Sequence, residues 1–257
     1  MPDHREFKLG KRPPKRDRRT LSIEKYLRKE DLNLPSRLDR TSLVRRWPSM
    51  LNKQIGDCTV AAAGHMIQTW TAVRGRAVIL RDSEILDAYS ALTGFDPAKP
   101  KIDRGATALE LLRFWRKRGI GGHKIDAYAE LALKDLFEMK ATVFLFGGCY
   151  IGLELPEIAF EDAKEGRDWR VSPGGAVGKG APNSWGLHAV PVVGYDRDSL
   201  NVVTWGMLKR MTWHFWETYG DEAYAVLSPD WIGAGGEAPI GVDLEGLKKD
   251  LREIAAR

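Results

Sequence analysis

The chain has few cysteines, no long apolar run and no grouping of metal ligands. Two cysteines in 257 residues exclude a disulfide framework as the basis of the fold. No apolar stretch approaches the ~20 residues of a membrane-spanning helix, and no apolar core follows the charged N-terminal residues, as it would in a secretory signal. We therefore expect a soluble protein of a reducing compartment, the cytoplasm, with no membrane partner.

Metal and cofactor chemistry is also not indicated. The cysteines and histidines contain no pair at the spacing of metal ligands, so we expect no metal and no cofactor. The composition is ordinary for a globular protein, with 43% hydrophobic and 29% charged residues. A chain of this length can bury a sizeable core as one large domain or two small ones.

Positive charge is concentrated at one end of the chain. Residues 1–20 contain eight Lys or Arg against three Asp or Glu, whereas the rest contains 32 of each. A neutral body argues against a nucleic-acid-binding face on the folded domain. The arm is a candidate contact for an acidic partner or a polyanion, but the interpretation we favour is a solvated, loosely ordered tail. We assign residues 1–42 to this basic arm and its lead-in.

The most informative stretch is a loop that leads into a helix predicted over 57–73. Gly56 permits a tight approach, and Asp57 is a candidate N-cap for the helix. Cys58 then falls in the first turn, where the positive end of the helix dipole favours the reactive thiolate. The residues leave two interpretations open, a nucleophile and a buried packing thiol.

A nucleophilic thiol needs a base within hydrogen-bond reach, usually a histidine. His188 opens a predicted strand directly after a long Gly-rich loop, the kind of position that displays a catalytic side chain. We therefore take His188 as the partner of Cys58. Cys149 lies in an apolar run without a helix terminus and is interpreted as inert core. The remaining histidines are less suited: His4, His65, His123 and His214.

The chain divides into a helical part and a β-rich part. A near-continuous apolar run over 142–155 predicts a buried strand pair or one bent strand, and residues 188–205 predict a hairpin. Hydrophobic periodicity predicts further helices over 20–31, 84–92, 106–118, 133–139, 212–219 and 244–256, and further strands over 78–80, 125–131 and 223–227.

The order of these features resembles the papain-like cysteine peptidases. The resemblance is carried by Cys58 at a helix start, by a far-downstream His188-Ala-Val followed by Val-Gly-Tyr, and by a strand ending in Trp205-Gly. The chain also resembles uncharacterised phage and prophage proteins that share the Gly-Asp-Cys helix start and the Ala-Tyr-Ala-Val-Leu-Ser-Pro-Asp-Trp ending at 223–231.

The resemblance implies an α+β, papain-like two-lobed fold over 43–257. The helical lobe would cover 57–120 and the β-rich lobe 125–232, with a C-terminal helix over 244–256 and the site in the cleft between the lobes.

The activity that the resemblance implies is cleavage of a peptide or isopeptide bond in a peptide or protein substrate. Cys58 would attack, and His188 would act first as base and then as acid. Asn52 or Gln54, together with the Cys58 backbone N–H, would stabilise the oxyanion. The residues expected to line the substrate are Gly105, Trp185, Gly186 and Trp205.

Two positions depart from the family pattern. The oxyanion glutamine, six residues before the cysteine, is replaced by Asn52, with Gln54 as a substitute candidate. The asparagine that orients the histidine, two residues before Trp-Gly, is replaced by Val203, which cannot orient an imidazole. Asn201 and Thr204 are the candidates for that role.

These departures support a second class of function. A carboxylate at Asp57 that points at the sulfur would oppose the thiolate, and an imidazole without its orienting group would lower the rate. The alternative is therefore a catalytically weak or inactive papain-like scaffold that acts as a binding module or a phage-virion-associated protein.

Overall fold

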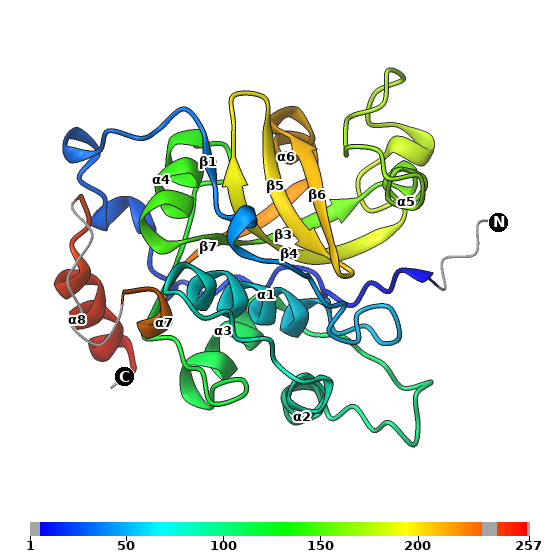
Figure 1. Ribbon diagram of the computed structural model, residues 1–257, viewed down its shortest axis with the longest axis horizontal. Helices are drawn as coiled ribbons and strands as arrows, with labels where there is room; N and C mark the ends of the chain where they lie inside the picture. The colour runs from blue at the N-terminus through cyan, green and yellow to red at the C-terminus, as the bar shows by residue number, and fades with distance from the viewer. Residues whose placement is uncertain (1–5, 233–240, 256–257) are drawn as a thin grey trace.

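The computed structural model describes residues 6–232 and 241–255. Within them, a seven-stranded antiparallel sheet separates two groups of helices (Figure 1). Its strands follow the order β2-β7-β3-β4-β5-β6, with β1 paired to β4. His4 and the end of the helix predicted over 244–256 lie outside the described residues.

The strands are short except at the centre of the sheet. They are β1 (Leu38–Asp39), β2 (Ala127–Glu130), β3 (Cys149–Leu155), β4 (Gly186–Tyr195), β5 (Ser199–Thr204), β6 (Met207–Thr212) and β7 (Gly220–Leu227). The helices are α1 (Cys58–Val73), α2 (Asp82–Thr93), α3 (Ala108–Lys117), α4 (Leu136–Phe146), α5 (Glu157–Lys164), α6 (Trp213–Tyr219), α7 (Pro229–Ile232) and α8 (Leu244–Ala255). Short 3₁₀ turns cover Ile23–Tyr26, Lys29–Asp31, Thr41–Leu43 and Gly178–Gly180.

Both faces of the sheet are buried, and each face belongs to a different core. Alternate residues of a strand point to opposite faces, so Ile151 joins the core beneath α4, α5 and α6, while Tyr150 joins the core beneath α1, α2 and α3. In Figure 1, α1 lies along the sheet with α2 beyond it. The α+β, two-lobed architecture expected from the sequence is therefore confirmed.

Helix α1 begins at Cys58, as the sequence predicts, but it is buried on nearly every side instead of along one face. His65 is a buried residue of this helix, and its Nε2 lies 2.8 Å from the carbonyl oxygen of Pro48. A central helix of this kind has its N-terminus held by the protein on all sides, which fixes the position of Cys58.

The prediction of strand structure over 142–155 is wrong in its first part. Residues 142–146 are the last part of α4 (Leu136–Phe146), which Asp135 caps at its N-terminus and Gly147 at its C-terminus. The Asp135 carboxylate accepts from the N–H groups of Phe137 and Glu138, and Gly147 adopts the left-handed conformation of a helix C-cap. These two capping residues stabilise a helix where apolar content alone suggested a strand.

Other differences are smaller. No strand forms over 78–80, and the segment predicted as a helix over 20–31 contains only two 3₁₀ turns. The helix predicted over 84–92 starts at Asp82 with Arg81 in the capping position. Strand β6 is an element that the sequence pattern missed.

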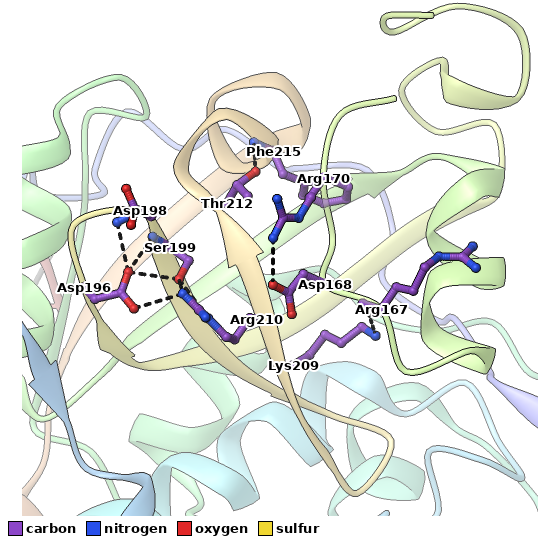
Figure 2. A network of polar contacts seen from close by, with 10 residues as sticks. All are labelled: Arg167, Asp168, Arg170, Asp196, Asp198, Ser199, Lys209, Arg210, Thr212 and Phe215. Atoms are coloured by element: carbon purple, nitrogen blue, oxygen red, sulfur yellow. Dashed lines mark hydrogen bonds and ion pairs between the residues drawn. The ribbon is translucent and has the colours of Figure 1, made fainter. Parts of the chain in front are cut away.

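A polar network ties β6 to the β4–β5 turn (Figure 2). The Asp196 carboxylate accepts from the N–H of Ser199 at 2.8 Å, and the Arg210 guanidinium donates to both Asp196 and Ser199. Lys209 donates to the carbonyl oxygen of Asp162 at 2.8 Å from a buried position. This network fixes β5, whose last residue, Thr204, reaches the candidate site.

No helix among residues 6–232 and 241–255 is long and apolar enough to span a bilayer. Over the same residues, His, Cys, Asp and Glu side chains form no group of three that could hold a metal ion.

Candidate active site

Cys58 is the first residue of α1 and is almost completely buried, with 1% of its surface exposed. Asp57 occupies the N-cap position, but its side chain does not cap the helix. Both of its carboxyl oxygens are buried without a hydrogen-bond partner, so the capping role predicted for Asp57 is wrong. Burial raises the pKa of Asp57 well above its usual value, and the nearby Asn52 amide offsets this only in part.

The Cys58 thiol is held in its neutral form. Burial is the largest cause that raises its pKa, to about 12, and the negative charge of Asp57 acts in the same direction. The backbone N–H groups of Ala189 and Gly10 and the charge of Lys11 lower this pKa but do not overcome burial. The dipole of α1 therefore does not produce a thiolate at neutral pH in this arrangement.

His188 lies in β4 and is fully buried. Its Nε2 lies 2.6 Å from the hydroxyl oxygen of Thr204, and its ring stacks on Trp205 at 4.4 Å between centroids and an interplanar angle of 17°. Burial, with a smaller effect of the Lys11 charge, lowers the pKa of His188 to about 3, so the imidazole is neutral. Nδ1 has no hydrogen-bond partner and is the ring nitrogen left for a thiol.

Helix α1, which begins at Cys58, packs against β4, the strand that contains His188. The thiol lies within reach of the N–H of Ala189, the residue directly after His188. No hydrogen bond joins the thiol to the imidazole in this closed arrangement, in which each group is neutral.

The other residues that we proposed for catalysis from the sequence lie in different environments. Thr204 contacts His188 directly, whereas Asn201 pairs with Gly194, six residues along β4 from His188. Asn52 is buried, and its amide donates to the carbonyl oxygens of two neighbours, Lys8 at 3.4 Å and Ile55 at 3.5 Å. The Gln54 side chain is exposed to solvent.

A network that the sequence reasoning missed holds the loop before Cys58. The Gly56 N–H donates to Asp103 at 2.6 Å, the Tyr89 hydroxyl donates to the same carboxylate, and the Gly105 N–H donates to the Tyr89 oxygen at 3.1 Å. In the sequence, Tyr89 was identified only as an apolar residue of a predicted helix, so no local signal indicated its hydrogen bonds. The network holds the two glycine loops on either side of the site together.

Residues 7–12, which we call the covering segment, lie across this site. Ala106 donates its N–H to the carbonyl oxygen of Gly10 at 3.0 Å, and Arg12 donates its N–H to the carbonyl oxygen of Ala106 at 2.9 Å. Lys8 donates its N–H to the carbonyl oxygen of Asn52 at 3.3 Å. In Figure 1 the dark-blue start of the chain runs along the boundary between the sheet and α1. The interpretation of residues 1–20 as a solvated tail is therefore wrong for this segment.

The covering segment contacts three of the four residues expected to line the substrate. A Cβ atom on Gly105 would overlap the carbonyl oxygen of Gly10, and one on Gly186 would meet the Leu9 side chain. The indole N–H of Trp205 donates to the carbonyl oxygen of Lys8 at 2.9 Å. Trp185 packs on Trp205 at 5.4 Å between ring centroids.

Lys11 anchors the covering segment. Its side chain is completely buried, and its ammonium nitrogen lies 2.5 Å from the Asp221 carboxylate and 2.8 Å from the Glu222 carboxylate, both in β7. Nothing local distinguishes Lys11 from the seven other basic residues of the arm, because its partners are more than 200 residues away along the chain.

Comparisons with known proteins find similarity in structure only. No protein-family model matches the sequence, and no curated protein matches it. Among solved structures, xylellain, a cysteine protease from Xylella fastidiosa, matches with a TM-score of 0.63 and 16% identity over 86% of this chain and 96% of its own.

Two further matches come from other organisms. Procathepsin L 3 of Tenebrio molitor matches with a TM-score of 0.55 and 12% identity over 87% of this chain and 77% of its own. The bromelain protease from Ananas comosus matches with a TM-score of 0.52 and 14% identity over 76% and 99%. At these identities the shared property is the fold, and the chain has the two-lobed α+β fold of the papain-like cysteine proteases.

Proposed function

We propose that the chain is a papain-like cysteine peptidase that its own covering segment holds in a closed form. The observation that carries this proposal is the position of residues 7–12, which lie on the surfaces where a peptide substrate would bind. The segment is held through the backbone of Ala106, and an extended substrate would use the same N–H and carbonyl groups. A structural role for the cysteine alone does not explain why a peptide covers it.

In the open form, Cys58 and His188 would carry out acyl transfer. The thiol transfers its proton to Nδ1 of His188, and the sulfur attacks the substrate carbonyl carbon. The oxyanion accepts hydrogen bonds from the Cys58 N–H and from the Asn52 amide, once Lys8 has left that amide. The imidazolium then protonates the leaving amine, and water hydrolyses the thioester with His188 as base.

Thr204 and Trp205 would orient the imidazole in place of the missing asparagine. When the Thr204 hydroxyl accepts from Nε2–H, the ring hydrogen stays on Nε2, and Nδ1 keeps the lone pair that receives the thiol proton. The stacked Trp205 ring fixes the plane of the imidazole.

Gly10→Val in the full chain provides the test. A side chain at Gly10 would overlap the backbone of Gly56, so the covering segment can no longer lie on the site. We expect this variant to hydrolyse labelled casein at least ~10-fold faster than the wild type. Adding Cys58→Ala or His188→Ala should return hydrolysis to background.

Gly174→Val is the matched control, because Gly174 lies in an exposed loop where a Cβ meets only the Ser172 hydroxyl, at 3.8 Å. It should behave as the wild type. An opened Gly10→Val variant that alkylates readily at Cys58 but hydrolyses no peptide would contradict the peptidase and favour the binding scaffold.

A further inference from the structure

The pocket that receives Lys11 is built for a positive charge. Asp221 and Glu222 are 8% and 2% exposed at their side chains, and both face the Lys11 ammonium group. Burying charges costs free energy unless they are paired. Two neighbouring buried carboxylates on one strand therefore indicate a site whose ordinary occupant is a cation.

Gly152 makes the space for that cation. It lies in β3 beside Asp221 and Glu222, at the point where the register of β3 and β7 shifts. A Cβ atom there would overlap Cε of Lys11 and the Asp221 carboxylate. The backbone of Gly152 is not left-handed, so the glycine is needed for room and not for its conformation.

The pocket also holds more negative charge than Lys11 neutralises. Two carboxylates face one ammonium group. The charge of Glu154 raises the pKa of Asp221, and the charge of Glu222 raises the pKa of Glu130. The Tyr224 hydroxyl donates to Glu222 at 2.9 Å and fixes that carboxylate. Oδ1 of Asp221 is buried and accepts no hydrogen bond, so the pocket retains an acceptor that a guanidinium could use.

The pocket adjoins the candidate nucleophile. Lys11 directly follows Gly10, whose N–H acts on the Cys58 thiol, and the charge of Lys11 is felt by both Cys58 and His188. A substrate residue whose side chain occupies this pocket would therefore lie close to the bond that Cys58 would attack.

We propose that Asp221 and Glu222, with Gly152 as the floor, form a specificity pocket that binds a Lys or Arg side chain of the substrate. The inference rests on the proposed peptidase function and deepens it: the substrates are basic peptides, and Lys11 occupies their pocket in the closed form. A guanidinium can bind a carboxylate through two parallel hydrogen bonds, so arginine is accepted as well as lysine.

Binding and hydrolysis are measured separately, so that the two proposals can fail independently. Fluorescein-labelled alanine-based hexapeptides carry one Lys, Arg, norleucine or Glu, moved through all six positions. Their affinity is measured by fluorescence anisotropy on full-chain Gly10→Val carrying Cys58→Ala, and their hydrolysis on Gly10→Val itself. Lys11→Glu, which places a like charge in the pocket, is the second way to open the site.

At one position we expect Lys and Arg to bind at least ~10-fold more tightly than norleucine, and Glu to bind most weakly. Asp221→Asn combined with Glu222→Gln should remove this preference, so that Lys and Arg bind no more tightly than norleucine. Glu165→Gln, at a carboxylate that is 55% exposed and outside the pocket, should preserve it.

Equal affinity for Lys and norleucine at every position would overturn the pocket, whether or not the peptides are cleaved. A basic preference in binding without any hydrolysis would support the pocket and contradict the peptidase. Hydrolysis without a preference for basic side chains would support the peptidase and contradict the pocket.

Discussion

Lys11→Met removes the charge of the anchoring residue and keeps most of its length. Methionine is unbranched and flexible, so it fits the channel beside Gly152 while Asp221 and Glu222 lose their cation. Breaking a buried ion pair by removing one partner costs about 3–5 kcal/mol. Burial already raises the pKa values of both carboxyls, so proton uptake relieves part of this cost, and we expect about 3 kcal/mol.

The free-energy cost of Lys11→Met should appear as release of the covering segment and not as unfolding of the domain. Asp221 and Glu222 lie on β7, which stays paired with β2 and β3, and water reaches their carboxylates once residues 7–12 leave. A change of about 3 kcal/mol corresponds to a roughly 10²-fold larger open population. Hydrogen exchange measures that population at two N–H groups that are bonded in the closed form: that of Arg12, which donates to the Ala106 carbonyl oxygen, and that of Ala106, which donates to the Gly10 carbonyl oxygen.

Lys15→Met is the matched control. Lys15 belongs to the same basic arm, but its side chain is 58% exposed and lies 3.7 Å from Glu110. Exposed ion pairs of this kind contribute little, so exchange should stay at the wild-type rate. Wild-type exchange in Lys11→Met would refute the role of Lys11 as the anchor.

Three further predictions concern the buried pair. The closed form lowers the pKa of His188 to about 3, against an ordinary value near 6.5, so proton uptake favours the open form as pH falls below ~6.5. The open population, obtained from exchange rates divided by the intrinsic amide rate at each pH, should rise by up to ~10-fold per pH unit; an open population that stays constant between pH 6.5 and 4 would contradict this. In Gly10→Val, Thr204→Val should lower kcat ~10-fold or more with little change in KM, because Nε2 loses its acceptor; an equal fall in Thr204→Val and Thr204→Ser would point to a packing role. Asp57→Asn should lower the pKa of Cys58, since the Asp57 charge raises it, and an alkylation profile that does not move toward lower pH would count against that effect.

Cys58 and His188 could be proposed from the sequence because the signals that mark them are local. A glycine loop, a helix start and a strand start mark these two residues in the sequence, and in the structure Cys58 begins α1 and His188 lies in β4, which packs against α1. The third position was harder to predict, since Val203 and Thr204 are adjacent and strand alternation decides which one faces the imidazole. Thr204 is the one that contacts it.

The covering segment could not be predicted from sequence, because its stability depends on distant residues. Eight basic residues in twenty look like a solvated tail when only local charge is considered. The pairing of Lys11 with two carboxylates of β7, and the fit of Gly10 against Gly56, appear only in three dimensions. The misassigned strand over 142–146 has a similar origin, since the helix that contains it is capped at its N-terminus by Asp135, which lies before the apolar run.

The most direct test of the account is the pH dependence of iodoacetamide alkylation at Cys58 in Gly10→Val, with and without His188→Ala. With His188 present, a thiolate–imidazolium pair should make Cys58 react at pH 6 at least ~10-fold faster than in the His188→Ala variant, while the buried Cys149 stays unmodified. Identical profiles in the two variants, each following a single thiol that titrates near ~8.5, would show that His188 does not act on Cys58 and would contradict the account.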